Sequence, residues 1–262
     1  MKAQPVTIYL PDTRGVAEFR YGLGNSKIGP GVYTYSRLPG KTGRAALGSG
    51  YIDHFVASLD RMTGTCPGAT EECLAICYAA RPVAEQGPVA RMWRRNSMPD
   101  LPPVPEDCRL LRIHVGGDFD TVDYIDRWRG MLLARPDVTA WAYTRSWRVP
   151  TLLPALEQLR ALPNVQLFAS MDKSTRELPP AGWRRAWIDG DDRLGHQLSE
   201  RNQRLHFADD LQTVFVDGTS SYVCPEETGR KTNCVECRYC FDGQHKDVTF
   251  LEHNGMAVKE AA

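Results

Sequence analysis

Residues 110–146 have the sequence LLRIHVGGDFDTVDYIDRWRGMLLARPDVTAWAYTRS, and this stretch decides the fold class. Its first six residues are mostly apolar and end at Gly116 and Gly117, which predicts a strand followed by a turn. Apolar residues then recur at helical spacing, at Val122, Ile125, Trp128, Met131 and Leu132. Residues 138–143 form a second strand candidate. A strand, a helix and a strand in this order predict a βα unit and a parallel sheet.

The alternation of strands and helices continues on both sides of this stretch. Helices are expected at 89–98 and 152–162, and strands at 165–169, 187–188, 205–208 and 213–216, while residues 1–59 indicate short strands and turns. The predicted fold is α/β, a partial or distorted parallel α/β barrel of about five or six strands, with an open doubly wound sheet as the competing architecture. We expect an α/β domain at 1–222 and a cysteine-rich, metal-binding C-terminal extension at 223–262.

Polar residues follow three of the predicted strands, where parallel sheets hold their ligands. They are Gly116, Gly117, Asp118, Thr144, Arg145, Ser170 and Asp172. Each has a structural alternative. Asp118 could cap the helix that opens near residue 120, and the others could shape strand ends and turns. As ligands, Arg145 would bind a carboxylate or phosphate, and Ser170 and Asp172 would bind ribose hydroxyls. His114, inside an apolar strand, is expected to be a core histidine.

Composition narrows the protein class. The 262 residues contain 32 basic and 32 acidic side chains, so the net charge gives no indication of a nucleic-acid partner. The arginines at 91, 94, 95, 184 and 185 are expected on solvated faces. No apolar run reaches the length of a membrane span, and the first residues do not have a signal-peptide pattern. We therefore expect a soluble, cytoplasmic protein with reduced cysteines that serve metal or redox chemistry, the alternative being a secreted disulfide protein.

Four of the eight cysteines lie near the C-terminus, at Cys224, Cys234, Cys237 and Cys240. The last three follow one another at two-residue gaps, and Pro225 follows the remote Cys224. This pattern is typical of loops that bind a [4Fe–4S] cluster. Four thiolates also satisfy tetrahedral zinc, although zinc sites more often use two separate pairs. We call these four residues the tail cysteine set.

Three further cysteines, Cys66, Cys73 and Cys77, form the first cysteine set. If the segment is helical, the last two lie on one face of the helix. Three thiolates without a local fourth leave one coordination position of a metal centre open, which is a feature of reactive sites. The alternative is that Cys108, a histidine or an aspartate closes the site. Cys108 itself has no partner at ligand spacing and is expected to be a buried free thiol.

The motifs TCPGATEECLAICYA, RIHVGGDFD, YTRS, LFASMD and VCPEETGRKTNCVECRYCF occur in this order between residues 26 and 242. Together they resemble the phage and mobile-element proteins named after mycobacteriophage gene product 88. The same motifs resemble, more distantly, the radical S-adenosylmethionine superfamily.

The second resemblance implies a partial α/β barrel in which three cysteines bind a [4Fe–4S] cluster with one open iron. It also implies that Gly116, Gly117 and Asp118 meet the amino group of S-adenosylmethionine and that the tail cysteine set binds an auxiliary cluster. The sequence departs from that superfamily in its cysteine gaps of six and three residues, and in Tyr78, which follows the last cysteine instead of preceding it.

The leading hypothesis is an iron–sulfur enzyme of radical S-adenosylmethionine type, with two [4Fe–4S] clusters and S-adenosylmethionine as cofactor. The alternative is a non-enzymatic phage protein that is stabilised by zinc or closed clusters and acts in binding or redox sensing.

Overall fold

The computed structural model describes residues 5–10, 17–40, 65–70, 72–73, 77, 79, 88–172, 174–188, 212–214, 220–243 and 246–250. Its strands are β1 (Pro5–Leu10), β2 (Ala17–Leu23), β3 (Val32–Tyr35), β4 (Leu110–Ile113), β5 (Thr139–Thr144), β6 (Val165–Ser170), β7 (Arg184–Ile188), β8 (Gln212–Val214), β9 (Ser220–Val223) and β10 (Asp247–Phe250). Its helices are α4 (Pro88–Asn96), α5 (Val122–Ala134), the 3-10 turn η1 (Ser146–Arg148), α6 (Leu153–Arg160) and the short α8 (Cys234–Cys237).

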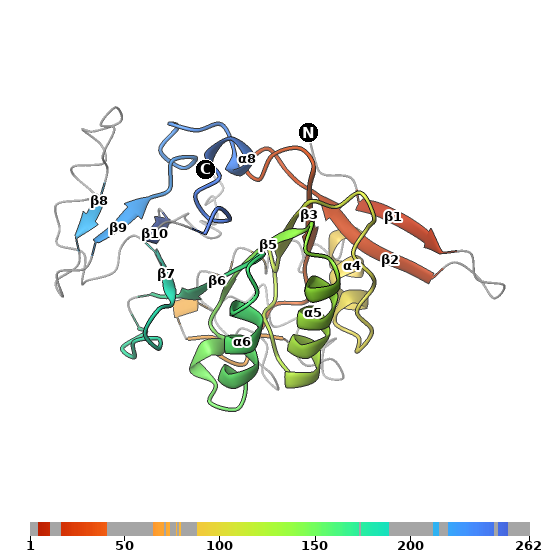
Figure 1. The fold of residues 1–262 in the computed structure, drawn as a ribbon, viewed down its shortest axis with the longest axis horizontal. Helices are drawn as coiled ribbons and strands as arrows, with labels where there is room; N and C mark the ends of the chain where they lie inside the picture. The colour runs from red at the N-terminus through yellow and green to blue at the C-terminus, as the bar shows by residue number, and fades with distance from the viewer. Residues whose placement is uncertain are drawn as a thin grey trace, which may run out of the picture.

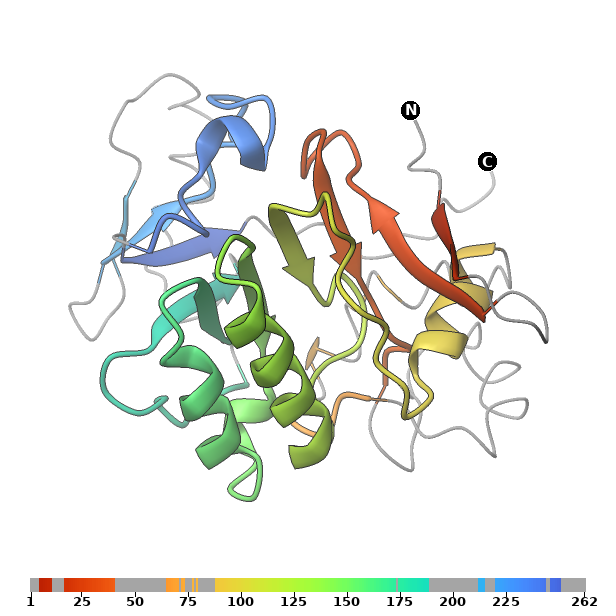
Figure 2. The same ribbon diagram turned by 45° about the vertical axis from the view of Figure 1, so that its right-hand side comes forward.

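The strands form one sheet in the order β1-β2-β3-β4-β5-β6-β7-β10-β9-β8 (Figures 1 and 2). From β3 to β7 each strand is parallel to the next strand along the chain, and β10 is inserted in parallel between β7 and β9. At one edge β2 and then β1 join β3 by antiparallel pairing, and at the other edge β8 pairs antiparallel with β9. The predicted α/β class and the mostly parallel sheet are thus confirmed.

The predicted elements between residues 88 and 188 all occur, with ends that differ by at most three residues from the prediction. The ten-stranded sheet is larger than expected and does not close, because β1 and β8 are its two edges. From β3 to β7 the strand order follows the chain without the reversal of a doubly wound sheet. The strand expected at 205–208 lies outside the described residues.

The two faces of the sheet bury different parts of the chain. Helices α5 and α6 pack together on one face, where Ala140 and Ala142 of β5 join the main core (Figure 1). The alternate residues Trp141 and Tyr143 point to the other face and contact the tail segment, residues 224–243. Side chains alternate across a strand, so β5 carries both cores. This second core holds the tail cysteine set against the sheet.

The chain beyond residue 222 contributes to the main sheet. β10 pairs with β7 and β9, and its Val248 is fully buried. The domain boundary that we predicted between residues 222 and 223 falls inside β9. These strands were missed because each has four residues and no clear apolar alternation.

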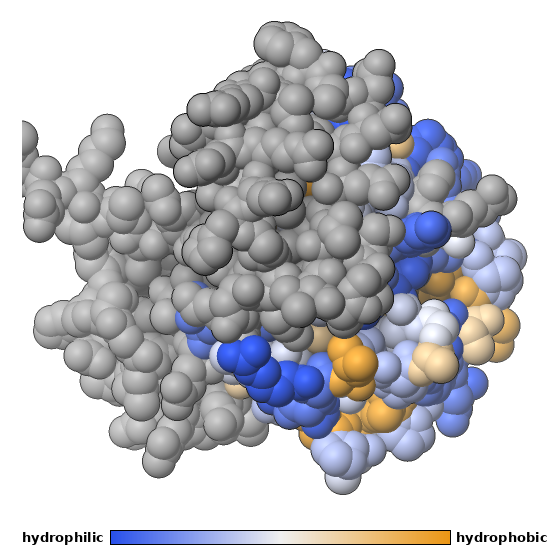
Figure 3. All heavy atoms as spheres, turned by 90° about the vertical axis from the view of Figure 1, so that its left-hand side faces the viewer, coloured by the Kyte–Doolittle hydropathy of each residue, from blue (hydrophilic) through white to orange (hydrophobic). Residues whose placement is uncertain are grey.

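The surface shows no single dominant apolar area among the described residues. Large exposed apolar side chains are spread over α4, α5 and several loops, and Figure 3 shows apolar residues interspersed with hydrophilic ones. None of the described helices is long and apolar enough to cross a membrane.

Candidate metal centres

The segment that carries the first cysteine set lies at the carboxyl ends of the parallel strands. Backbone N–H groups of Thr65 and Cys66 donate to the carbonyls of Leu38 and Gly40, at 3.3 and 2.6 Å. Gly68 packs so closely that a Cβ atom there would lie 2.1 Å from the carbonyl oxygen of Arg145, just after β5. The sequence therefore places these cysteines where a parallel α/β sheet binds its ligands.

The three thiols of this set lie close to one another. Burial raises the pKa of Cys66 well above its usual value, and the negative charges of Asp118, Cys73 and Cys77 raise it further. These charges can act on Cys66 only from nearby, although Cys66, Cys73 and Cys77 are each only partly buried. The structure thus brings together three residues that the sequence separates by six and three positions, and it adds the carboxylate of Asp118.

Both carboxylate oxygens of Asp118 accept hydrogen bonds. One oxygen accepts from Thr144 Oγ1 at 2.6 Å and from the N–H of Phe119 at 2.8 Å, and the other accepts from the N–H of Arg145 at 2.8 Å. Burial raises the pKa of Asp118 to about 6, although these hydrogen bonds oppose the shift. The predicted helix-capping role is wrong, because Thr121 caps α5 by accepting from the N–H of Tyr124.

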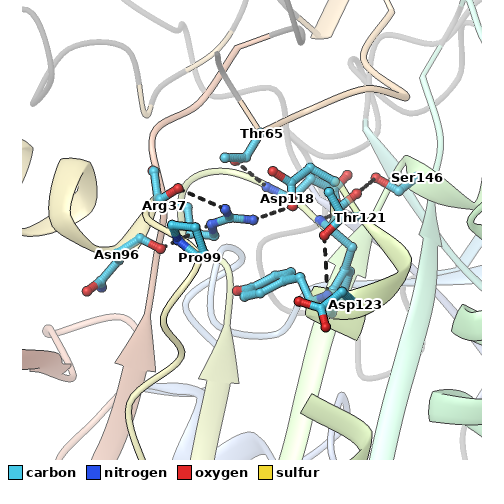
Figure 4. Close-up of polar contacts among 12 residues, drawn as sticks. Arg37, Thr65, Asn96, Pro99, Asp118, Thr121, Asp123 and Ser146 are labelled. Carbon is cyan, nitrogen blue, oxygen red and sulfur yellow. Dashed lines mark hydrogen bonds and ion pairs between the residues drawn. The ribbon is translucent and has the colours of Figure 1, made fainter. Parts of the chain in front are cut away.

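Gly116 and Gly117 allow this turn to pack tightly. A Cβ atom on Gly116 would lie 2.8 Å from the ring of Trp93, and Gly117 has a φ of +81°, which glycine adopts at little cost. A Cβ atom on Gly117 would also meet Thr65 Oγ1 at 2.6 Å and Arg37 Cβ at 2.8 Å. Arg37 in turn donates to the carbonyl of Asn96 (Figure 4). Packing alone accounts for both glycines.

Arg145 and Asp172 form a buried ion pair, with 2.8 Å between Nη1 and Oδ2. Asp172 also accepts from Thr70 Oγ1, which in turn accepts from the N–H of Cys73 at 3.0 Å. A chain of contacts therefore runs from the end of β5, through the residues after β6, to the first cysteine set. Ser170 contributes its carbonyl, which accepts from Arg145 at 3.4 Å.

These contacts show where the predicted cofactor-binding residues lie. Thr144, Arg145 and Asp172 hold the first cysteine segment on the sheet, and the guanidinium of Arg145 is already paired with a carboxylate. Their predicted roles toward a cofactor stay predictions. A surface pocket next to them is lined by Pro67, Gly68, Ala69, Thr70, Arg148, Val149 and Ser174.

The tail cysteine set gathers on the other face of the sheet. Cys224 follows β9, and Cys234 and Cys237 begin and end α8, whose first turn is capped by Asn233. Burial raises the pKa of all four thiols, and the charge of Cys240 raises the pKa of Cys224 and Cys234 further. The four thiols are thus neighbours, with Cys240 among the other three.

The loop between β2 and β3 covers this set from one side. The N–H of Cys234 donates to the carbonyl of Lys27 at 2.9 Å. Gly29, at a φ of +100°, lies so close that a Cβ atom would be 2.8 Å from Asn233 Oδ1 and Val235 Cγ2. Gly29 therefore allows the tail segment to pack against this loop.

Three residues beside the tail cysteine set were not predicted as site residues. Tyr143 packs against the same apolar cluster as Cys240. Burial raises the pKa of Cys234 and Cys240, and the positive charge of Arg112 opposes that shift. Arg184 donates to the carbonyls of Tyr239 and Cys240 at 3.0 and 3.2 Å. The expected solvated role of Arg184 is therefore wrong. A signal was present for Arg112, a charged residue at an interior position of an apolar strand.

The spacing of the sulfur atoms bears on the kind of metal. Tetrahedral zinc, with Zn–S bonds of about 2.3 Å, holds its thiolates about 3.8 Å apart. Among the described residues, the one group of three potential ligands within 4.8 Å of one another is Cys224, Glu226 and Glu227, and Lys27 pairs with both glutamates. No three thiols of either set are that close. A four-iron cluster binds each thiolate to a different iron, so it holds the sulfurs farther apart than one ion does.

Cys108 and His114 behave as expected for core residues. Cys108 is a fully buried free thiol just before β4, at the opposite end of that strand from Gly116 and Asp118. It therefore does not close the first site. His114 is buried, and its Nε2 lies 2.9 Å from the hydroxyl of Tyr124.

Comparison with known proteins identifies relatives in phages. The sequence profile of the family described as Gene product 88 matches residues 102–243. The chain is 26% identical to the Gene 88 protein of Mycobacterium phage L5 over 218 residues, which cover 71% of this chain and 81% of the relative. It is 25% identical to the Gene 88 protein of Mycobacterium phage D29 over 219 residues, with the same shares. No solved structure matches the chain.

Proposed function

This chain belongs to the Gene product 88 family, and we propose that it is an iron–sulfur protein of radical S-adenosylmethionine type. In this proposal the first cysteine set binds a [4Fe–4S] cluster with an open position, and the tail cysteine set binds a closed auxiliary cluster. The observation that carries the proposal is the grouping of Cys66, Cys73 and Cys77 with Asp118 at the carboxyl ends of parallel strands.

The architecture supports this proposal. The strands from β3 to β7 follow one another in parallel, and the connecting helices α5 and α6 lie on one face. The same succession of parallel strands and helices occurs in α/β barrels, so it is compatible with the partial barrel that the proposal implies.

The donor sets fit the clusters that the proposal requires. A cluster bound by three thiolates would supply an iron that binds a further ligand and exchanges one electron with it. The chain's own residues would orient that ligand. Asp118, whose charge acts on Cys66, would supply the carboxylate that meets an ammonium group of that ligand.

A second function has one observation in its favour. Asp118, Arg145 and Asp172 are bound largely by other parts of the chain, as expected of groups that hold the cysteine segment in place. Under this alternative the chain is a non-enzymatic binding or redox-sensing protein with metal centres that only stabilise the fold.

Metal analysis of anaerobically purified protein tests the first part of the proposal. We expect about eight irons and as many sulfides per chain, as two four-iron clusters contain. Cys66→Ala and Cys234→Ala should each remove about half of the iron, because the ligands belong to separate sites. Cys108→Ala is the matched control and should remove none. Zinc without sulfide would refute the iron–sulfur proposal.

Electron paramagnetic resonance separates the enzyme from the alternative. S-adenosylmethionine added to the reduced protein should change the spectrum of the cluster that Cys66→Ala removes, and leave the other cluster unchanged. Asp118→Asn keeps the shape of the side chain and should weaken this response without loss of iron, because the lost charge faces the ammonium and not the metal. A fully loaded protein whose spectrum ignores S-adenosylmethionine would favour the non-enzymatic alternative.

A further inference from the structure

The surface pocket beside the first cysteine set has walls from three parts of the chain. One wall is residues 67–70, the stretch between the first two cysteines of that set. The second wall is residues 148–149, which follow β5, and the third is Ser174, which follows β6. Strands β5 and β6 are parallel neighbours, so the pocket lies at their carboxyl ends, where α/β proteins bind their ligands.

The size and the lining of this pocket indicate the kind of molecule that it could bind. Its volume is about 450 Å³, which is within the range of sites that bind small molecules. Three of the lining residues are apolar, two carry hydroxyl groups, and Arg148 supplies the charge. Among the described residues, no carboxylate lines the pocket. The lining therefore favours a ligand with a negatively charged group.

Two contacts hold the guanidinium of Arg148 at the pocket wall. Its Nη1 donates to the carbonyl of Gly68 at 3.2 Å, and its Nη2 donates to Oε1 of Glu177 at 2.9 Å. A guanidinium has five N–H donors, so each terminal nitrogen keeps a second hydrogen for a ligand. The side chain of Glu177 is 56% exposed. This ion pair is therefore weak, and an anion in the pocket can compete with it.

We infer that this pocket binds the substrate of the proposed enzyme through an anionic group, a carboxylate or a phosphate, that pairs with Arg148. The inference rests on the proposed function. Thr70 lines the pocket, and its hydroxyl oxygen lies 3.0 Å from the backbone nitrogen of Cys73. A molecule in the pocket would therefore lie beside the cluster that the first cysteine set is proposed to bind.

The anionic group could also belong to S-adenosylmethionine, which carries a carboxylate. Asp118 is the residue proposed to meet the ammonium group of that cofactor, and it does not line the pocket. This separation favours the substrate as the source of the anionic group. The experiment below tests the two sources against each other.

Isothermal titration calorimetry of the anaerobic protein with inorganic phosphate and with acetate, at constant ionic strength, tests this inference. Arg148→Gln should weaken binding of the tighter of the two anions at least about tenfold, because it removes charged hydrogen-bond donors. Arg160→Gln is the matched control. Arg160 also donates to one carbonyl and one carboxylate, those of Gly182 and Glu157, but it does not line the pocket, so binding should stay unchanged.

A second variant should act in the opposite direction. Glu177→Gln removes the carboxylate that competes for Arg148, and the exposure of this residue makes the change tolerable to the fold. We expect anion binding to become stronger, by up to about fivefold, the factor that an exposed ion pair contributes. Weaker binding in Glu177→Gln would mean that the anion does not pair with Arg148, and would overturn the inference.

Excess S-adenosylmethionine identifies the source of the anionic group. Anion binding that persists in its presence supports a separate substrate pocket, whereas binding that it abolishes would assign the pocket to the cofactor and overturn the inference. Iron-loaded wild type that binds neither anion, or Arg148→Gln that binds as tightly as wild type, would also overturn it and leave the iron–sulfur proposal standing. Anion binding by a wild-type protein that contains no iron would instead refute the iron–sulfur proposal and leave an anion-binding pocket.

Discussion

The ion pair between Arg145 and Asp172 is the contact whose removal we expect to cost most in stability. Their side chains are 6% and 2% exposed, and the two charged atoms are 2.8 Å apart. Arg145→Met would leave the Asp172 carboxylate buried without its cation. Breaking a buried pair on one side costs about 3–5 kcal/mol. Hydrogen bonds to Asp172 from Thr70, Ser174 and Thr175 remain, so we expect about 3 kcal/mol.

The chain offers a matched control for this variant. Arg127 and Asp123 of α5 are also 2.8 Å apart, but their side chains are 45% and 70% exposed. Exposed pairs contribute about 0–1 kcal/mol, so Arg127→Met should have little effect. Urea unfolding followed by tryptophan fluorescence measures both variants. A loss of less than about 1 kcal/mol in Arg145→Met, equal to that in Arg127→Met, would refute the assignment of a strong buried pair.

The cost of Arg145→Met should also depend on pH. Burial opposes the ionisation of Asp172, but Arg145 and the hydrogen bonds outweigh it and hold the pKa of Asp172 below its usual value. A lowered pKa in the folded state adds stability above the unfolded pKa of about 4, and this stability is lost as the pH falls through the folded pKa. The difference between wild type and Arg145→Met should therefore be full at pH 7 and shrink below about pH 4.

Three further variants test the contacts of the tail segment and the assignment of the cysteines. Gly29→Ala should destabilise the protein by at least about 1 kcal/mol more than Gly31→Ala in urea unfolding, because both glycines have positive φ but only a Cβ at position 29 meets the tail segment. Trp141→Ala should cost about 3–5 kcal/mol and expose the tail segment to limited proteolysis, since the buried indole packs on Phe241 with ring centroids 4.9 Å apart. Cys108→Ala should leave the iron content unchanged at any pH where the protein is folded, since this thiol belongs to the main core.

The sequence predicted the middle of the fold well, for a physical reason. From residue 110 to 170 each strand and helix has its own apolar period, so each is visible locally. β9 and β10 lack such a period. They are strands because neighbours in the sheet supply their hydrogen bonds, and only the tertiary structure shows those neighbours.

The candidate sites were predictable in part for the same reason. Spacing along the chain predicted both cysteine sets as candidate ligands, because the ligands of one metal centre must be brought together by the chain. Spacing could not show which groups surround them. Arg145 was expected to bind a ligand, yet it pairs with Asp172, because the two strands that carry them are neighbours in the sheet.

The strand β5 and the residues after it link the surroundings of the two cysteine sets. Tyr143 packs against the same apolar cluster as Cys240, and the next residue, Thr144, donates to Asp118 beside the first set. Arg145 then binds Asp172, which holds Thr70 and through it the N–H of Cys73. Of these three consecutive residues, the first lies beside the tail cysteine set and the other two lie beside the first cysteine set. Ligand replacements in one set should remove metal from that set alone, whereas a change that shifts the end of β5 should disturb both sets at once.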